Sequence, residues 1–326
     1  MGNRYVDMGL CAPVNVTWEV TFKCNLSCIH CLSNAGKKHT AELTTAECLQ
    51  IVDTLSAMNV FQLNIGGGEP FMRPDFIEGM DYAHSKGIVT CISTNGTLID
   101  DRIARLLDNP LVYFQVSLDG ATAASNDAIR GKGSFLHAVN ALACLQKRNI
   151  EVSVNTVLTR LSFPELDRMA ALAADFGAKF RVSRFRPSGR GKTAWKRLNV
   201  DKKQMAAFSD WLNRHLDVST GDSFFSVSSQ ERQSLGLNMC GACKLTCCIS
   251  PEGKVYPCAF LQEKEFLAGR LPADDLADIW QNSPVFRSFR ELEIKSCESC
   301  SRFDLCHGGC PAIAYHTQRK FGVPDP

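Results

Sequence analysis

The 326-residue sequence lacks the features that mark membrane, secreted and nucleic-acid-binding proteins. No apolar run reaches the roughly 18 residues that a membrane-spanning helix needs, and no apolar stretch of the signal-peptide kind follows the N-terminus. Val6 stands where a myristoylation signal requires Ser or Thr. The formal net charge is only +2, so composition offers no basic surface for nucleic acid. We therefore expect a cytoplasmic protein with neither membrane nor nucleic-acid partners.

Cysteine, by contrast, is plentiful: there are 16, seven before residue 150 and nine after residue 239. Disulfides are rare in the cytosol, so this uneven distribution favours clusters of metal ligands. The first is Cys24-Asn25-Leu26-Ser27-Cys28-Ile29-His30-Cys31, with the spacing C-x3-C-x2-C. Iron–sulfur clusters usually take four thiolates, so a loop with three can leave one iron open to a small molecule. Zinc sites, the alternative along with three unrelated buried cysteines, favour two C-x2-C pairs.

The order of apolar patterns predicts an α/β fold. Residues 14–21 alternate apolar and polar side chains, which predicts a strand, and Thr44 with Glu47 forms a capping box that opens a helix. Five more strands are predicted at 61–65, 88–93, 112–117, 152–158 and 179–185. Helices are predicted at 74–86, 100–107, 135–148, 164–176 and 204–216. Six strand–helix units predict a parallel sheet with right-handed crossovers, closed only in part as a (β/α)6 TIM-like barrel.

Polar or glycine residues follow the strands at the edge where such sheets bind ligands. Gly66-Gly67-Gly68-Glu69 follows the second strand, Thr94-Asn95-Gly96 the third and Leu118-Asp119-Gly120 the fourth; the fifth carries Asn155. Turn chemistry explains any one of these alone. Together, in register with the cysteine loop, they predict a ligand site.

A second cysteine region follows the barrel. Residues 187–203 read as a linker after the barrel, and the domains expected are an N-terminal segment 1–13, the barrel 14–190, a bridging linker and helix 191–239 and a small cysteine-rich domain 240–326. The latter carries Cys240, Cys243, Cys247, Cys248 and Cys258, then Cys297, Cys300, Cys306 and Cys310 at the spacing C-x2-C-x5-C-x3-C. Single C-x2-C pairs would suit zinc equally well.

The first cysteine loop resembles the signature of the radical S-adenosylmethionine (SAM) enzymes, in which the open iron chelates SAM and the reduced cluster cleaves it to a 5′-deoxyadenosyl radical. His30 departs from that signature, which usually has an aromatic residue there; a ring still stands at this position, so we expect cluster packing to survive. The resemblance implies that Cys24, Cys28 and Cys31 are cluster ligands. It also implies a SAM pocket made of Gly66, Gly67, Gly68, Glu69, Ser93, Asn95, Ser117, Asp119, Arg130 and Asn155.

The second cysteine region resembles the SPASM extension, which carries two auxiliary iron–sulfur clusters, so three clusters are expected in all. The resemblance assigns Cys240, Cys243, Cys258 and Cys310 to the first auxiliary cluster, and Cys297, Cys300 and Cys306 to the second. The last cysteine of the pattern is absent from this sequence. We expect either that the natural protein continues past Pro326 to a cysteine or that another ligand replaces it: Asp304, His307, His316, Asp325 or water. Cys247 and Cys248 are either a swapped ligand or ordinary buried thiols.

A narrower resemblance, to the mycofactocin maturases, rests on residues 9–21, 64–70, 184–191 and 220–225 and spans the chain nearly end to end. It implies oxidative decarboxylation of the C-terminal tyrosine of a small precursor peptide, then a carbon–carbon bond between that tyrosine and the preceding valine. It also implies a separate peptide-chaperone protein, which fits the lack of a peptide-binding domain before the barrel, and a reducing electron donor of the flavodoxin or ferredoxin type.

No catalytic acid or base stands out in the sequence. Arginine grips a carboxylate best, so Arg184, Arg186 and Arg190 are candidates to hold the C-terminal carboxylate of the peptide. The alternatives are a related maturase that acts on another peptide or on a haem precursor, and a zinc-stabilised binding protein with a degenerate barrel. The absence of brown iron–sulfur absorption would favour the zinc protein.

Overall fold

The computed structural model describes residues 9–36, 41–220, 240–301 and 303–326. Residues 221–225, which contribute to the narrower family resemblance, lie outside these ranges, as does the expected domain boundary at residue 239. No helix within the described ranges is long and apolar enough to span a membrane.

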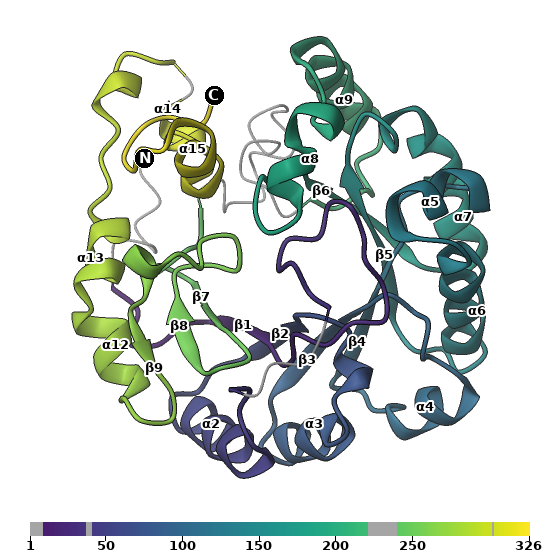
Figure 1. The fold of residues 1–326 in the computed structure, drawn as a ribbon, viewed down its shortest axis with the longest axis horizontal. Helices are drawn as coiled ribbons and strands as arrows, with labels where there is room; N and C mark the ends of the chain where they lie inside the picture. The colour runs from purple at the N-terminus through teal and green to yellow at the C-terminus, as the bar shows by residue number, and fades with distance from the viewer. Residues whose placement is uncertain (1–8, 37–40, 221–239, 302) are drawn as a thin grey trace.

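Six parallel strands form the wall of an open barrel, as predicted (Figure 1). They are β1 (Asn15–Glu19), β2 (Gln62–Gly66), β3 (Val89–Thr94), β4 (Val112–Ser117), β5 (Val152–Leu158) and β6 (Lys179–Arg184). Their helices are α2 (Thr45–Ala57), α3 (Phe76–Ser85), α4 (Asp101–Leu106), α5 (Ala123–Arg130), α6 (Ser134–Gln146), α7 (Leu166–Asp175) and α9 (Lys202–Arg214). Most of these helices cover the outside of the sheet (Figure 1).

The helix start at Thr44 confirms the capping box read from the sequence. The Thr44 hydroxyl accepts a hydrogen bond from the Glu47 N–H at 3.3 Å, and the Glu47 carboxylate accepts one from the Thr44 N–H at 2.8 Å. Each bond satisfies a backbone donor that the first turn of a helix leaves free. Asp201 and Gln204 build the same device at the start of α9.

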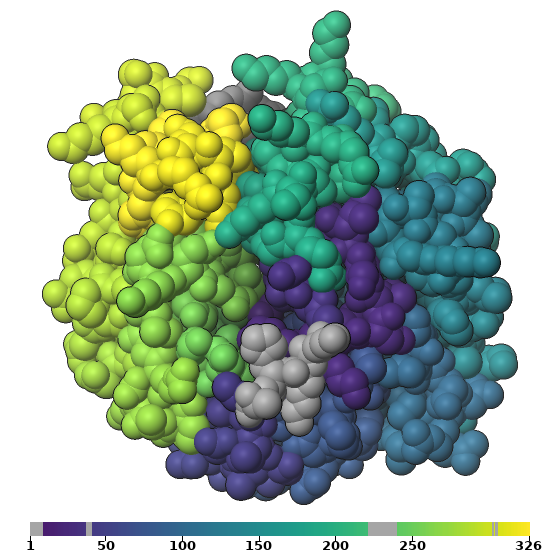
Figure 2. Space-filling view, viewed as in Figure 1, coloured from purple at the N-terminus to yellow at the C-terminus, as the bar shows by residue number. Residues whose placement is uncertain are grey.

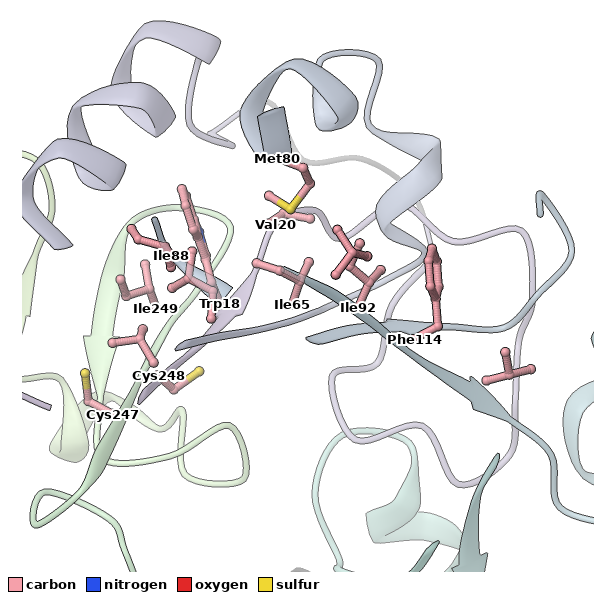
Figure 3. Packing of buried hydrophobic residues seen from close by; sticks show 14 of the residues in the cluster. Trp18, Val20, Ile65, Met80, Ile88, Ile92, Phe114, Cys247, Cys248 and Ile249 are labelled. Atoms are coloured by element: carbon pink, nitrogen blue, oxygen red, sulfur yellow. The ribbon is translucent and has the colours of Figure 1, made fainter. Parts of the chain in front are cut away.

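The two faces of the barrel sheet differ in polarity because side chains alternate along each strand. The outer face packs against the helices and is almost fully buried; Figure 3 shows Trp18, Ile65, Ile92 and Phe114 on this face. By the same alternation it also includes Val16, Leu63, Val116, Val154 and Val182, all of them buried. The alternate positions face the lumen and are mostly polar: Asn15, Thr17, Glu19, Asn64, Cys91, Ser93, Gln115, Ser117, Ser153, Asn155, Arg181 and Ser183. Because the hydrophobic core lies on the outer face, the lumen-facing positions can carry polar side chains.

The cysteine-rich region continues the barrel sheet, which the sequence analysis did not anticipate. Strand β7 (Thr246–Ile249) pairs in parallel with β1, and β8 (Lys254–Tyr256) and β9 (Gly269–Arg270) extend the sheet in antiparallel fashion. Cys247 and Cys248 lie on β7 opposite Val16 and Thr17 and are fully buried. The remaining elements are α12 (Leu276–Asn282), α13 (Pro284–Arg290), α14 (Phe303–Cys306), α15 (Pro311–Gln318) and the short helices η1 (Pro70–Met72), η2 (Phe163–Glu165), η3 (Lys264–Phe266) and η4 (Lys295–Cys297).

The interpretation of residues 187–203 as a linker is wrong. Helix α8 (Gly191–Leu198) occupies the middle of this segment. Ala194 and Leu198 are buried against Phe185, and the Trp195 ring lies 5.3 Å from the Phe185 ring, centroid to centroid. The Gly and Lys residues that suggested a loop supply the start and the exposed face of an amphipathic helix.

Two leucines of helix α6 provide a matched test of this core. Leu142 is 0% exposed, whereas Leu136 is 62% exposed. We predict that Leu142→Ala lowers the free energy of unfolding by about 2–5 kcal/mol, because it removes buried methyl groups and leaves a cavity. Leu136→Ala should lower it by less than about 1 kcal/mol. Urea unfolding of both variants measures the difference, and equal losses would contradict the packing described above.

Candidate active site

The loop after β1 carries Cys24, Cys28 and Cys31 and lies inside the ring of strands (Figure 1). Two backbone hydrogen bonds join the ends of this loop: the Cys24 N–H donates to the Gly36 carbonyl at 2.8 Å, and the Gly36 N–H donates to the Phe22 carbonyl at 2.8 Å. All three thiols are partly exposed. Burial raises the pKa of the Cys24 thiol to about 11, and the nearby groups that add to this rise include Cys28 and Cys31. The structure therefore gathers the three predicted ligands.

This loop fits an iron–sulfur cluster. A bound metal keeps coordinating thiols deprotonated even where burial favours the neutral form, and three gathered thiols leave one iron of a four-iron cluster open. No group of three His, Cys, Asp or Glu side chains in the described ranges is arranged to hold a single metal ion. A four-iron cluster makes a different demand, since each thiolate binds its own iron.

A buried ion cluster ties the cysteine loop to the barrel. The Asp119 carboxylate is 2.7 Å from His30 Nε2 and 2.6 Å from Arg130 Nε, and it accepts the Val157 N–H at 2.7 Å. Burial alone would raise the pKa of Asp119, but Arg130 and His30 outweigh it and hold the pKa well below its usual range. Asp119 is 0% exposed. His30 therefore replaces the usual aromatic residue with a polar anchor.

Arg130 is the arginine of this group and lies against the cluster loop. It is 7% exposed, and its carbonyl oxygen lies 3.8 Å from the Cys28 sulfur. Burial lowers its pKa, but Asp119 and the Cys28 and Cys31 thiols outweigh that effect and keep the pKa above its ordinary value. A fixed positive charge here is suited to an anionic ligand or an anionic cluster.

The glycine run after β2 lies directly against the cysteine loop. A Cβ atom on Gly68 would come within 2.1 Å of the Lys23 carbonyl oxygen, and one on Gly67 within 2.7 Å of the Thr21 carbonyl oxygen. The Gly68 N–H donates to Thr21 at 2.7 Å, and the Glu69 N–H donates to Lys23 at 2.9 Å. Glycine is required because no side chain fits between the two segments.

Glu69 is almost fully buried behind this run, at 1% exposure. Its two carboxylate oxygens accept the Thr94 hydroxyl and the Asn95 N–H, each at 2.8 Å. Burial raises the pKa of Glu69 to about 7, despite the opposing effect of these hydrogen bonds. Asn95 in turn donates to Asn25 at 2.9 Å. The second and third strand ends thus meet at the cysteine loop, and Thr94, which the sequence placed at this strand end but not in the SAM pocket, binds Glu69 there.

Two other predicted pocket residues, Ser93 and Asn155, contact lumen-facing side chains of the neighbouring strands. Gln115 donates to the Ser93 hydroxyl at 3.0 Å, and the Ser183 hydroxyl donates to Asn155 at 2.7 Å. Ser117 lies opposite Asn155 in the sheet register. The assignment of these residues to SAM stays a prediction.

The three candidate arginines, Arg184 at the end of β6 and Arg186 and Arg190 after it, differ in what they bind. Arg184 forms a bidentate ion pair with Asp325, in which Arg184 Nη2 donates to Asp325 Oδ1 at 2.9 Å. Figure 2 shows the yellow C-terminal segment against the green segment that follows β6. The Arg186 guanidinium lies 4.4 Å from the Phe260 ring centroid. Arg190 donates to the Cys28 carbonyl at 3.0 Å and to a carbonyl further along the same loop. Arg190 therefore supports the cysteine loop, a role the sequence analysis did not foresee.

The cysteines assigned to the first auxiliary cluster lie near one another, and their role as ligands stays a prediction. Burial, then the neighbouring thiols of Cys240 and Cys310, raise the pKa of Cys258. Burial likewise raises the pKa of Cys243, which has Cys247, Cys258 and Cys240 beside it.

The three remaining ligand candidates also gather. Burial raises the pKa of Cys297, and Cys306 and Cys300 add to that rise. Of the replacement ligands considered, Asp325 is bound to Arg184 and accepts the Cys310 N–H at 3.1 Å, and His316 Nε2 is 2.8 Å from the Phe260 carbonyl. The Asp304 side chain lies outside the described residues.

A buried carboxylate that the sequence analysis missed lies at the end of β1. Glu19 is 2% exposed and accepts the Gln262 side-chain N–H at 2.8 Å. Burial raises its pKa to about 7, and the buried thiol of Cys248 lies nearby. Its lumen-facing position in an alternating strand was the available signal. Glu19 joins the barrel to the cysteine-rich region through Gln262.

Family models agree with this arrangement. The model of the radical SAM superfamily matches residues 18–173, and that of an iron–sulfur cluster-binding domain, SPASM, matches residues 240–306. The class of protein is therefore a radical SAM enzyme with a SPASM domain, which confirms the predicted fold class and the expected use of SAM and iron–sulfur chemistry.

Comparison with individual proteins identifies the family within this class more closely. The chain is 45% identical to mycofactocin maturase MftC of Mycobacterium ulcerans (strain Agy99), over 98% of this chain and 89% of that protein. It is 29% identical to the AdoMet-dependent heme synthase of Methanosarcina barkeri (strain Fusaro / DSM 804), over 97% and 96%. Streptococcus suis SuiB bound to precursor peptide SuiA shares the fold, with a TM-score of 0.80 at 18% identity, over 99% of this chain and 76% of that one. The chain belongs to the mycofactocin maturase family.

The buried Glu19 predicts a pH dependence of stability. The unfolded chain ionises this carboxyl at its ordinary pKa of 4.5, whereas the folded protein keeps it protonated up to about 7. The folded state therefore loses stability as pH rises between these values.

We predict that Glu19→Gln reduces the fall in urea midpoint between about pH 5 and about pH 8, because glutamine has no proton to lose. Glu78→Gln, an exposed site on α3, should leave the fall unchanged. An unchanged pH profile in Glu19→Gln would mean that this carboxyl is ionised in the folded protein.

Proposed function

We propose that this protein is a peptide maturase. It would decarboxylate the C-terminal tyrosine of a small precursor peptide oxidatively and then join that tyrosine to the preceding valine by a carbon–carbon bond. The observation that carries this proposal is the 45% identity to MftC over 98% of the chain. SAM, when bound and reductively cleaved, supplies the 5′-deoxyadenosyl radical that abstracts hydrogen from the peptide.

The chain's own residues would hold this chemistry in three places. Cys24, Cys28 and Cys31 would bind the SAM-cleaving cluster, and the polar strand ends around Glu69 and Asn155 would bind SAM. Two auxiliary clusters would be held by Cys240, Cys243, Cys258 and Cys310, and by Cys297, Cys300 and Cys306. The gathering of each thiol set in the fold supports the total of three clusters.

The polar side chains of the lumen are better suited to bind a peptide than an apolar substrate. Its inward positions carry amide, hydroxyl and guanidinium groups, which can bind peptide backbone and a carboxylate. Arg184, Arg186 and Arg190 stay candidates for the carboxylate, although Arg184 and Arg190 would have to give up the partners described above. We further propose a cytoplasmic protein that works with a separate peptide chaperone and a flavodoxin- or ferredoxin-type reductant.

Product analysis tests the proposal directly. Anaerobic enzyme with reconstituted clusters, SAM, reductant and a precursor peptide ending in Val-Tyr, with its chaperone, should yield 5′-deoxyadenosine and a peptide lighter by CO2 and two hydrogens. Fragmentation should then place a new bond between the last two residues. A precursor ending in Val-Phe is the matched control for the tyrosine hydroxyl.

Two results would overturn the proposal. One is SAM cleavage with the peptide mass unchanged under conditions in which the peptide binds. The other is loss of carboxyl groups from a haem precursor in place of the peptide, which would favour the haem-precursor alternative that the M. barkeri relative illustrates.

A further inference from the structure

Arg181 occupies the middle of β6 and faces the barrel lumen. Its neighbours Phe180 and Val182 are 5% and 0% exposed on the outer face, so alternation directs Arg181 inward. In the sheet register it stands opposite Asn155, on the adjacent strand β5. Asn155 lies beside the inward-facing Ser183 hydroxyl. Arg181 is thus one position across the sheet from a predicted SAM-pocket residue.

The Arg181 guanidinium has no partner within the described part of the chain. The residue is half-buried, its Nε atom is fully buried without a hydrogen bond, and no ion pair is formed. Burial lowers its pKa, and the nearby Arg186 guanidinium lowers it further, whereas the Cys91 thiol opposes them. A buried charge is expensive unless it is paired. The unpaired Arg181 guanidinium is therefore suited to bind an anion.

Three other arginines of the site contrast with Arg181. Arg130 is paired with Asp119, Arg184 with Asp325, and Arg190 with loop carbonyls. Each serves the architecture of the site. Arg181 makes no such contact, so its guanidinium is available to a ligand that enters the lumen.

We propose that Arg181 binds the C-terminal carboxylate of the peptide substrate. A guanidinium matches a carboxylate through two parallel hydrogen bonds. Its place across from Asn155 sets the last residue of the peptide next to the predicted SAM pocket, and such positioning controls the rate of a radical abstraction. This inference rests on the proposed function, since it assumes a peptide with a free carboxylate.

The test compares the binding of two probes that differ only at this group. The enzyme with reconstituted clusters and SAM is titrated calorimetrically with the chaperone complex of a precursor peptide ending in Val-Tyr, as the free carboxylate and as the C-terminal amide. Hydrogen bonds to a charged group predict that the unaltered protein binds the carboxylate about 10- to 100-fold more tightly. Arg181→Gln should bind both probes equally, and Arg181→Lys should keep part of the preference because it keeps the charge.

Two controls separate this role from others. Arg168→Gln, at an exposed site on α7, should keep the full preference for the carboxylate. The affinity of Arg181→Gln for SAM should match that of the unaltered protein. A lower SAM affinity with the peptide preference intact would overturn the inference and assign Arg181 to the carboxylate of SAM.

The outcomes also distinguish this inference from the proposed function. If Arg181→Gln still prefers the carboxylate, the grip lies elsewhere and the proposed function stands. If the unaltered protein binds both probes equally, a carboxylate grip is absent altogether. If it binds neither probe, the proposed function fails and the inference fails with it.

Discussion

The active site depends on one buried carboxylate. Asp119 stands at the end of β4 and holds His30 of the cysteine loop, Arg130 at the end of α5 and the Val157 N–H of β5. Removing one member of a buried ion group leaves the others uncompensated, at a cost of about 3–5 kcal/mol. The group fixes the loop from one side. The glycine run before Glu69 packs against a second side of the loop, and the Arg190 side chain binds its backbone carbonyls.

The same division of the sheet into two faces explains how a stable barrel can hold reactive chemistry. The outer face contributes the core, so the lumen positions are free to carry Glu19, Arg181 and the predicted pocket residues. Strand β7 extends this sheet without a break. The auxiliary cysteines thereby share a rigid scaffold with the cysteine loop, and Gln262 crosses between the two parts to Glu19.

The sequence predicted the barrel strands to within about two residues, because alternation of apolar and polar side chains is a local signal. The capping box at Thr44 is also local, and it predicted the start of the first helix. The grouping of the cysteines into ligand sets came from the family resemblance and stays a prediction. The sequence did not predict β7, whose four residues are too few to show a period. The pairing of His30 with Asp119 was out of reach as well, because 89 positions separate them. Glu19 and Arg181 read as ordinary polar positions until the fold placed them in a buried lumen.

The role of Asp119 is tested most directly by measuring the iron content of Asp119→Asn in two backgrounds, the unaltered protein and a variant without the three loop cysteines. Asp119→Asn should lose one cluster's worth of iron, because Arg130 and His30 lose their counterion and the cysteine loop loosens. A Cys24→Ala, Cys28→Ala, Cys31→Ala variant should also lose one cluster and all formation of 5′-deoxyadenosine, while the auxiliary iron remains. Adding Asp119→Asn to that variant should then remove no further iron. Equal iron loss in both backgrounds, or full iron content in Asp119→Asn alone, would contradict the claim that this carboxylate holds the cluster loop.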